Sequence, residues 1–243
     1  MIHTVVDLNN RGVQHLQSGD HESARMAFKE ALQRTTHLLN VKQEAEEGVE
    51  YENLDPVEFF MGHPLFKGLN LNDIEANTNT EPRLNSITRV PISNSLVADQ
   101  IGSFVYGQAL LLSTECCVNP LLHEFCHRES SVIMFNLALV HHWRGMRYGL
   151  ISLLPKALRL YEMSYSLIRY GAAFETTYLH LALLNNRGQI HHELIEYDDA
   201  DKCFKNLKDI LTSGASQIVD GADVHGFLMN IMFLDSPQLA GAA

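Results

Sequence analysis

The sequence predicts a mostly α fold: an α-solenoid of three helical hairpins with a C-terminal capping helix, and a loop-rich insertion that carries a small β-hairpin. The main evidence is an internal repeat. Residues 8–15 read LNNRGVQH and residues 184–191 read LNNRGQIH, so the two copies lie 176 positions apart. Each copy is followed at the same distance by the pattern Ala-x-x-x-Phe, at residues 24–28 and 200–204. A unit that recurs in this way indicates a fold built from stacked copies of one helical hairpin.

The first hairpin is expected within residues 1–47. Apolar residues recur at helical spacing from about residue 2 to residue 39, in two runs separated by Ser18-Gly19-Asp20. Glycine commonly ends a helix and aspartate commonly caps the next one. This tripeptide therefore predicts the turn between the two helices.

Residues 48–128 are expected to form an insertion between the first and second hairpins. The acidic stretch at residues 44–58 predicts a solvated helix end that runs into a loop, and residues 53–83 are rich in Pro, Gly and Asn. Residues 84–92 alternate apolar and polar side chains as a half-buried strand does, and residues 103–112 are a candidate partner strand. These two segments predict the small β-hairpin.

Residues 129–243 are expected to hold the second and third hairpins and the capping helix, in one structural domain with the rest of the chain. The predicted helices cover residues 131–144, 148–170, 175–194, 197–211 and 222–234. The last of these helices is apolar on most of its circumference, which predicts burial against the preceding pair.

The spacing within each copy resembles the tetratricopeptide repeat, in which a small residue of a first helix precedes an Ala-x-x-x-aromatic pattern in a second. A degenerate middle copy has this pattern at residues 134–141 and 157–161, with Ala138 at the position of the glycine. A small residue lets two helices approach closely, and the aromatic ring fills the space beside it. The chain departs from the family pattern because arginine replaces the expected leucine and histidine replaces the usual tyrosine. In the middle copy the alanine of the second helix also follows the small residue by 19 positions, against 12 in the outer copies.

The resemblance implies a concave groove that is lined by the first helix of each hairpin and that binds a peptide or a protein subunit. The implied groove residues are Asn9, Asn10, Val13, Leu16, Phe135, Asn136, Leu139, His142, Asn185, Asn186, Gln189 and His192. Asn10, Asn136 and Asn186 occupy one shared position of the repeat. An amide there can bind the backbone of an extended peptide, or it can tie neighbouring helices together, and the sequence leaves both roles open. Since the implied groove has no lysine, we do not expect it to grip a C-terminal carboxylate.

Charge and composition narrow the classes of partner. The 243-residue chain has a formal net charge of −11 and no basic stripe, which argues against nucleic acid. No segment approaches the roughly 20 consecutive apolar residues of a membrane helix, and the N-terminus lacks the pattern of a signal peptide. Four cysteines are too few for a disulfide framework in a chain of this length. We therefore expect a cytoplasmic protein, with the nucleus as an alternative. No cofactor is expected, because the chain has neither a phosphate-binding glycine loop nor a dinucleotide fingerprint.

One short motif indicates an enzymatic function instead of a binding function. The pentapeptide HEFCH matches the zinc-protease motif H-E-x-x-H. On a helix, His123 and His127 would share a face and could ligate Zn²⁺, while Glu124 would activate water; Cys126 is a further candidate ligand. The preceding Asn-Pro predicts a helix start or a loop, whereas the motif needs a well-formed helix. The sequence therefore favours a non-enzymatic protein-interaction scaffold. A structural subunit of a larger assembly and a zinc-dependent hydrolase are the alternatives.

Overall fold

The computed structural model of the chain describes residues 2–47, 87–92, 104–113, 122–168, 177–213 and 221–235. Of these residues 82% are helical, in seven α-helices, and two short strands form a sheet. The prediction of a mostly α fold with one small sheet is thus confirmed for the described part of the chain.

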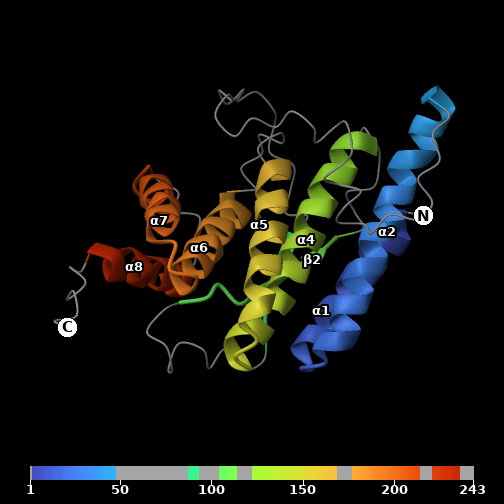
Figure 1. Cartoon of the computed structure of the whole chain (residues 1–243). Coiled ribbons are helices and arrows are strands. Elements are labelled where there is room, and N and C mark those ends of the chain that lie inside the picture. Colours follow the sequence, from blue (N-terminus) through green and yellow to red (C-terminus); the bar gives the residue numbers. More distant parts are fainter. Residues whose placement is uncertain are drawn as a thin grey trace. The chain divides into compact units, whose positions relative to one another are not determined.

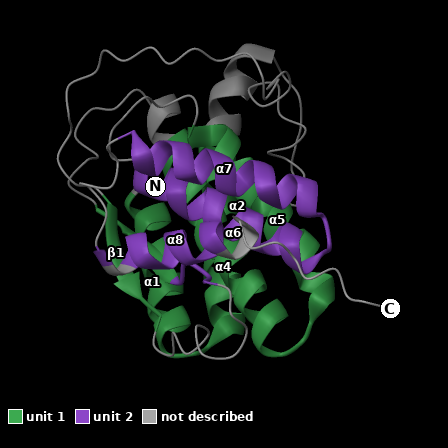
Figure 2. Cartoon of the chain, turned by 90° about the vertical axis from the view of Figure 1, so that its left-hand side faces the viewer, with its two compact units in different colours: residues 1–93, 108–176 green, residues 94–107, 177–243 purple. Residues whose placement is uncertain are grey.

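The helices are α1 (Ile2–Gln17), α2 (His21–Glu47), α4 (Leu122–Arg147), α5 (Leu154–Ile168), α6 (Thr177–Glu193), α7 (Tyr197–Thr212) and α8 (Gly221–Asp235). A short 3-10 helix, η3 (Ile151–Leu153), precedes α5, and the strands are β1 (Ile87–Pro91) and β2 (Gln108–Leu112). The chain forms two compact units, drawn in different colours in Figure 2. Unit 1 comprises Met1–Ser93 and Gln108–Thr176, and unit 2 comprises Asn94–Gly107 and Thr177–Ala243.

Unit 1 is built around α4. In this unit α1 packs against α2, while α4 packs against α5 on one flank and against α2 on the other (Figure 1). Every side chain from residue 129 to residue 140 is buried, as expected for a helix that is surrounded on all sides. Helices α4 and α5 form a hairpin, and the turn after α4 contains Gly149, whose φ of 65° is not helical. The second helix of this hairpin therefore begins at Leu154, later than the predicted residue 148. Pro155 lies in the first turn of α5, where its missing N–H leaves no helical bond unmade.

The sheet of unit 1 has two antiparallel strands. Its register pairs Ile87 with Leu112 and Pro91 with Gln108. Strand β1 ends at Pro91 and β2 begins at Gln108, so residue 92 and residues 104–107 of the predicted strands are not part of the sheet, while residues 84–86 and 103 lie outside the described residues. Strand β2 packs against α1 and α4, so this short sheet lies on the first helices of the two hairpins of unit 1.

Unit 2 contains α6, α7 and α8. Helices α6 and α7 pack as a hairpin, and α8 contacts both of them. The predicted packing of the last helix against the preceding pair is confirmed, although α8 is buried on one face only. One face, with Phe227 and Ile231, is buried, whereas Leu228, Met229 and Met232 are exposed.

A close approach between two helices recurs at the two copies of the sequence repeat. A Cβ atom on Gly12 of α1 would lie 2.5 Å from the ring of Phe28 on α2. In unit 2, a Cβ atom on Gly188 of α6 would lie 2.7 Å from the ring of Phe204 on α7. Real Cβ atoms do not approach a ring so closely, so each aromatic side chain occupies space that only glycine leaves open.

Candidate functional site

A cluster of three asparagines in unit 1 binds the backbone of β2. Asn10 of α1 accepts a hydrogen bond from the N–H of Leu112 (2.9 Å), and its amide donates to the carbonyl of the same residue (2.8 Å). Asn136 of α4 makes the same pair of bonds with Leu110, at 2.9 and 2.8 Å. Asn9 adds a further bond to the carbonyl of Leu110 (3.0 Å). We call these three residues the unit 1 cluster.

Unit 2 contains a second cluster with the same wiring. Asn186 of α6 accepts from the N–H of Tyr106 (2.8 Å) and donates to the carbonyl of that residue (3.1 Å). Asn230 of α8 makes the corresponding pair with Phe104, at 2.8 and 2.6 Å. Asn185 also donates to the carbonyl of Phe104 (3.0 Å). We call these three residues the unit 2 cluster.

The asparagines of each cluster also bind one another. Asn136 donates to Asn9 across α4 and α1 (2.9 Å), and Asn230 donates to Asn185 across α8 and α6 (2.8 Å). Within each unit the amides therefore serve both roles that the sequence left open, since they hold an extended backbone and tie two helices together. The backbone that they hold belongs to the chain itself, in residues 104–112.

The chemistry of the carboxamide explains this arrangement. A primary amide carries one acceptor oxygen and one donor nitrogen, so it can satisfy the N–H and the C=O of one strand residue as a neighbouring strand would. Alternate residues of a strand direct these groups to opposite edges. Because Leu110 and Leu112 use the asparagine edge, Ala109 and Leu111 face β1, as the register requires.

Burial makes these bonds energetically important. Asn9, Asn136, Asn185 and Asn186 are fully buried, Asn230 is buried, and Asn10 is half-buried. A buried N–H or C=O that loses its partner costs roughly 1–3 kcal/mol. Each cluster therefore stabilises the helices and the segment they hold as one cooperative arrangement.

The other predicted groove residues lie mainly in the interior of their own unit. Val13, Leu16, Phe135, Leu139 and His142 are fully buried in unit 1. His142 lies 3.3 Å from the hydroxyl of Tyr161, whose ring contacts Phe135 at 5.6 Å between centroids. The ring of Tyr161 thus contacts α4 one turn before and one turn after Ala138, the small residue of the middle copy. In unit 2, Gln189 is buried and donates to Glu193 (3.3 Å), and the half-buried His192 contacts Tyr197.

Sequence analysis missed Asn230, because α8 lies outside the repeat pattern. The sequence did carry one signal, because Asn230 is an amide in a largely apolar helix. A polar side chain that is buried there needs a hydrogen-bond partner. Nothing in the sequence, however, indicates that the partner is the backbone of Phe104, which is 126 positions away.

The HEFCH segment lies in the first turns of α4. His123 and Cys126 fall outside the side chains that the structure describes, and His127 is buried. Among the described residues, no group of three His, Cys, Asp or Glu side chains is placed to hold a metal ion.

A buried carboxyl lies just beyond this segment. The Glu129 side chain is 1% exposed and accepts a hydrogen bond from Arg128 (2.6 Å). Burial raises the pKa of Glu129 to about 7, because desolvation outweighs the attraction of Arg128. This group is a candidate source of pH dependence in unit 1.

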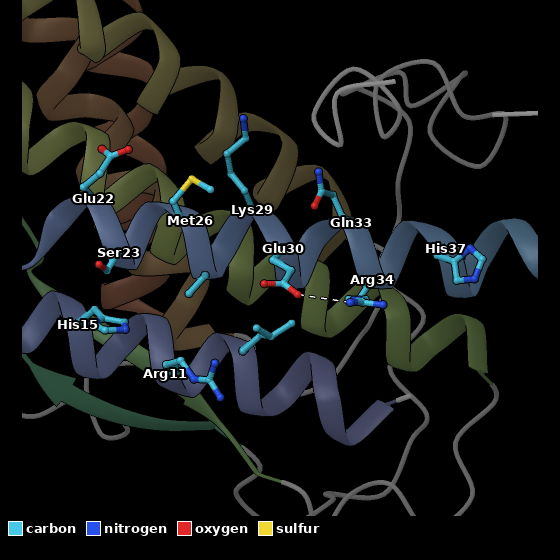
Figure 3. A pocket seen from close by; sticks show the side chains of 12 residues that line it. Arg11, His15, Glu22, Ser23, Met26, Lys29, Glu30, Gln33, Arg34 and His37 are labelled. Carbon is cyan, nitrogen blue, oxygen red and sulfur yellow. Dashed lines mark hydrogen bonds and ion pairs between the residues drawn. The ribbon is translucent and has the colours of Figure 1, made fainter. Parts of the chain in front are cut away.

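A hollow lies between α1 and α2 in unit 1 (Figure 3). Its lining mixes charges of both signs, with Arg11, Lys29 and Arg34 beside Glu22 and Glu30. An ion pair of 3.4 Å joins Arg34 to Glu30 within it. Because its charges oppose one another, the hollow indicates no particular class of ligand.

None of the described helices combines the length and apolar character needed to cross a membrane. Comparison with protein-family models, curated proteins and solved structures finds no match for this chain.

Proposed function

We propose that the protein is a non-enzymatic protein-interaction scaffold built from tetratricopeptide-like hairpins, and that its asparagine clusters hold an extended peptide segment. The observation that carries this proposal is the two-point pairing of Asn10, Asn136, Asn186 and Asn230 with single backbone residues. Such pairing recognises an extended backbone irrespective of side chains, as strand addition does.

The repeated hairpin geometry supports the solenoid part of the proposal. In the turn between α1 and α2, the N–H of Asp20 donates to the carbonyl of His15 (2.9 Å). The corresponding turn between α6 and α7 has Glu196 donating to His191 (2.8 Å). These pairs lie 176 positions apart, like the two copies of the repeat. A chain that reuses one hairpin in this way is suited to stacking and to presenting surfaces to partners.

A structural subunit of a larger assembly is the second candidate. The exposed face of α8, with Leu228, Met229 and Met232, favours it, because adjacent exposed apolar side chains mark contact surfaces. In this alternative the partner covers α8 and leaves the asparagine clusters untouched.

Peptide display against the full-length protein tests the main proposal. We expect enrichment of extended, proline-poor sequences whose binding weakens at least roughly tenfold in Asn10→Ala and Asn186→Ala, since each change removes a two-point contact. Asn206→Ala, an exposed change on α7, is the matched control. Melting curves identify variants that fail to fold, and Asn10 is informative here because it is only half-buried. Absence of enrichment, or binding that is indifferent to both asparagines, would overturn the proposal.

A further inference from the structure

One end of unit 1 gathers positive charge in a chain that is acidic as a whole, with a formal net charge of −11. Burial and the cations of three helices lower the pKa of His141, on α4, to about 4. The buried Nδ1 of this ring has no hydrogen-bond partner in the described part of the chain. The cations around the ring are Arg25 and Lys29 of α2, Arg144 of α4 and Lys156 of α5.

A carboxylate within this group of charges shows the chemistry that it takes. Glu22 accepts a hydrogen bond from Arg25 (3.1 Å) and another from Arg144 of α4 (3.3 Å). The side chain of Glu22 is 61% exposed, so solvent screens these ion pairs, and its single charge cannot balance the cations. Arg147 adds further positive charge at the end of α4, where its guanidinium lies 4.8 Å from the centre of the Trp143 ring.

Exposed apolar side chains adjoin these cations. The segment between α4 and α5 carries Tyr148, Leu150 and Ile151, which are 57%, 42% and 52% exposed. The ring of Tyr148 contacts that of His21, with 6.3 Å between centroids, so this segment lies beside the first turn of α2 (Figure 1). Adjacent exposed apolar side chains mark contact surfaces. We call the cations around His141, together with Arg147 and this apolar segment, the basic surface.

The position of Lys156 does not serve the stability of its own helix. This residue is exposed and lies in the first turn of α5. The helix dipole favours negative charge in a first turn and opposes a cation there. The position suits a side chain that pairs with an anion from outside the unit.

The charge of the whole chain favours a short protein segment as that anion. A nucleic acid or an anionic membrane extends beyond the basic surface and would meet the excess negative charge of the rest of the chain. A short segment contacts the basic surface alone. Its carboxylates can pair with the guanidinium and ammonium groups, while its apolar side chains cover the exposed segment between α4 and α5.

We propose that the basic surface binds an acidic segment of a partner protein, in which Asp or Glu residues are interspersed with apolar residues. The inference goes beyond the proposed function, because it adds a second binding surface that does not involve the asparagine clusters. Charge complementarity at such a surface speeds the encounter and disfavours basic partners.

The test measures the binding of a fluorescein-labelled peptide of Glu, Leu and Ser residues to the full-length protein by fluorescence anisotropy. Lys156→Glu reverses a charge of the basic surface and should weaken binding at least roughly tenfold. Glutamate suits the first turn of a helix, so this variant should fold. Lys205→Glu, at an exposed position of α7, is the matched control. It changes the total charge equally and should leave the affinity within about twofold.

A second pair of variants tests the apolar part of the basic surface. Ile151→Ser should weaken binding of the same peptide at least roughly threefold, because it removes apolar area that the peptide covers. Ile195→Ser, at a 73% exposed isoleucine of unit 2, is the control. A peptide with Lys in place of Glu should not bind. The acidic peptide should also shift the imidazole NMR signals of His141 at neutral pH.

Four outcomes would overturn the inference. The first is absence of peptide binding, which leaves the proposed function untouched. The second is equal weakening by Lys156→Glu and Lys205→Glu, or binding that leaves the signals of His141 unshifted, since the peptide then binds elsewhere. The third is single-stranded DNA or phosphatidylserine vesicles that bind as tightly as the peptide, which would replace the protein segment by another class of anion. The fourth is a concentration-dependent dimer that Lys156→Glu abolishes, which would assign the basic surface to a second copy of this chain.

Discussion

The two asparagine clusters have the same wiring but hold their segments with different help. In unit 1 the held residues also pair with β1, so both edges of the segment are satisfied by the fold. In unit 2 the rings of the held residues Phe104 and Tyr106 also pack against Phe227 of α8. The comparison teaches that the same amide pairing can be combined with a strand in one unit and with aromatic packing in the other.

The turns of the two repeated hairpins share one backbone conformation, although their residues differ. Gly19 has φ 80° between α1 and α2, and Ile195 has φ 65° between α6 and α7. Both turns close with the same hydrogen bonds, from Gly19 to Leu16 (3.2 Å) and from Ile195 to His192 (3.1 Å). A β-branched residue is strained at positive φ. The hairpin geometry therefore imposes the turn even where the residue opposes it.

The largest expected effect comes from removing one amide of each cluster. Asn136→Ala and Asn186→Ala should each lower the free energy of unfolding by about 3 kcal/mol. The first change removes the partner of the Leu110 N–H and of the Asn9 side-chain oxygen, and the second removes both amide bonds to Tyr106. Chemical denaturation measures this loss, and Asn206→Ala should stay within about 0.5 kcal/mol of the wild type. A large loss of stability for one of the two asparagine variants, with none for the other, would show that the two clusters do not contribute equally.

The next effect concerns the close approach of helices in both hairpins. Gly12→Ala and Gly188→Ala should each lower stability by about 2 kcal/mol, since overpacking against Phe28 or Phe204 exceeds the gain in helix propensity. Gly221→Ala is the control, because a Cβ atom there meets nothing within 4 Å. Equal tolerance of all three changes would contradict the shared packing.

The next prediction concerns the pH dependence of stability. It tests unit 1 alone, because Glu129 belongs to that unit. A carboxyl whose folded pKa is raised from 4.5 to about 7 contributes stability below pH 4.5 that is lost as the pH rises through 7. The stability of Glu129→Gln relative to wild type should therefore rise by roughly 3 kcal/mol between pH 4.5 and 8. His141, whose pKa burial lowers to about 4, is present in both proteins and cancels in this difference. A difference in stability that does not change with pH would show that Glu129 is not the source of the pH dependence.

The smallest effect tests the strained turn. Ile195→Gly should raise the melting temperature and stabilise the protein by about 1 kcal/mol, because it relieves positive-φ strain at a side chain that is 73% exposed. The reciprocal Gly19→Ile should destabilise by about 1–2 kcal/mol. Destabilisation by Ile195→Gly would mean that this side chain makes a stabilising contact.

The contrast between Gly12 and Asn230 shows which features could be predicted from the sequence and which could not. The close approach at Gly12 follows from its spacing to Phe28, because both residues lie within one helical hairpin. The shared position of Asn10, Asn136 and Asn186 likewise points to an amide site. Asn230 has no place in that pattern, and the strained turn at Ile195 has no signature of its own, so both become visible only in the folded chain.

The sequence by itself determined the helical hairpins, the glycine contacts and the alignment of the amides, because these depend on periodicity and turn chemistry within short stretches of chain. Only the tertiary structure decided what the amides hold. The bonds from Asn10 to Leu112 and from Asn186 to Tyr106 span 102 and 80 positions. A carboxamide can pair with any extended backbone, so the choice of residues 104–112 depends on which segment packing brings to the helices.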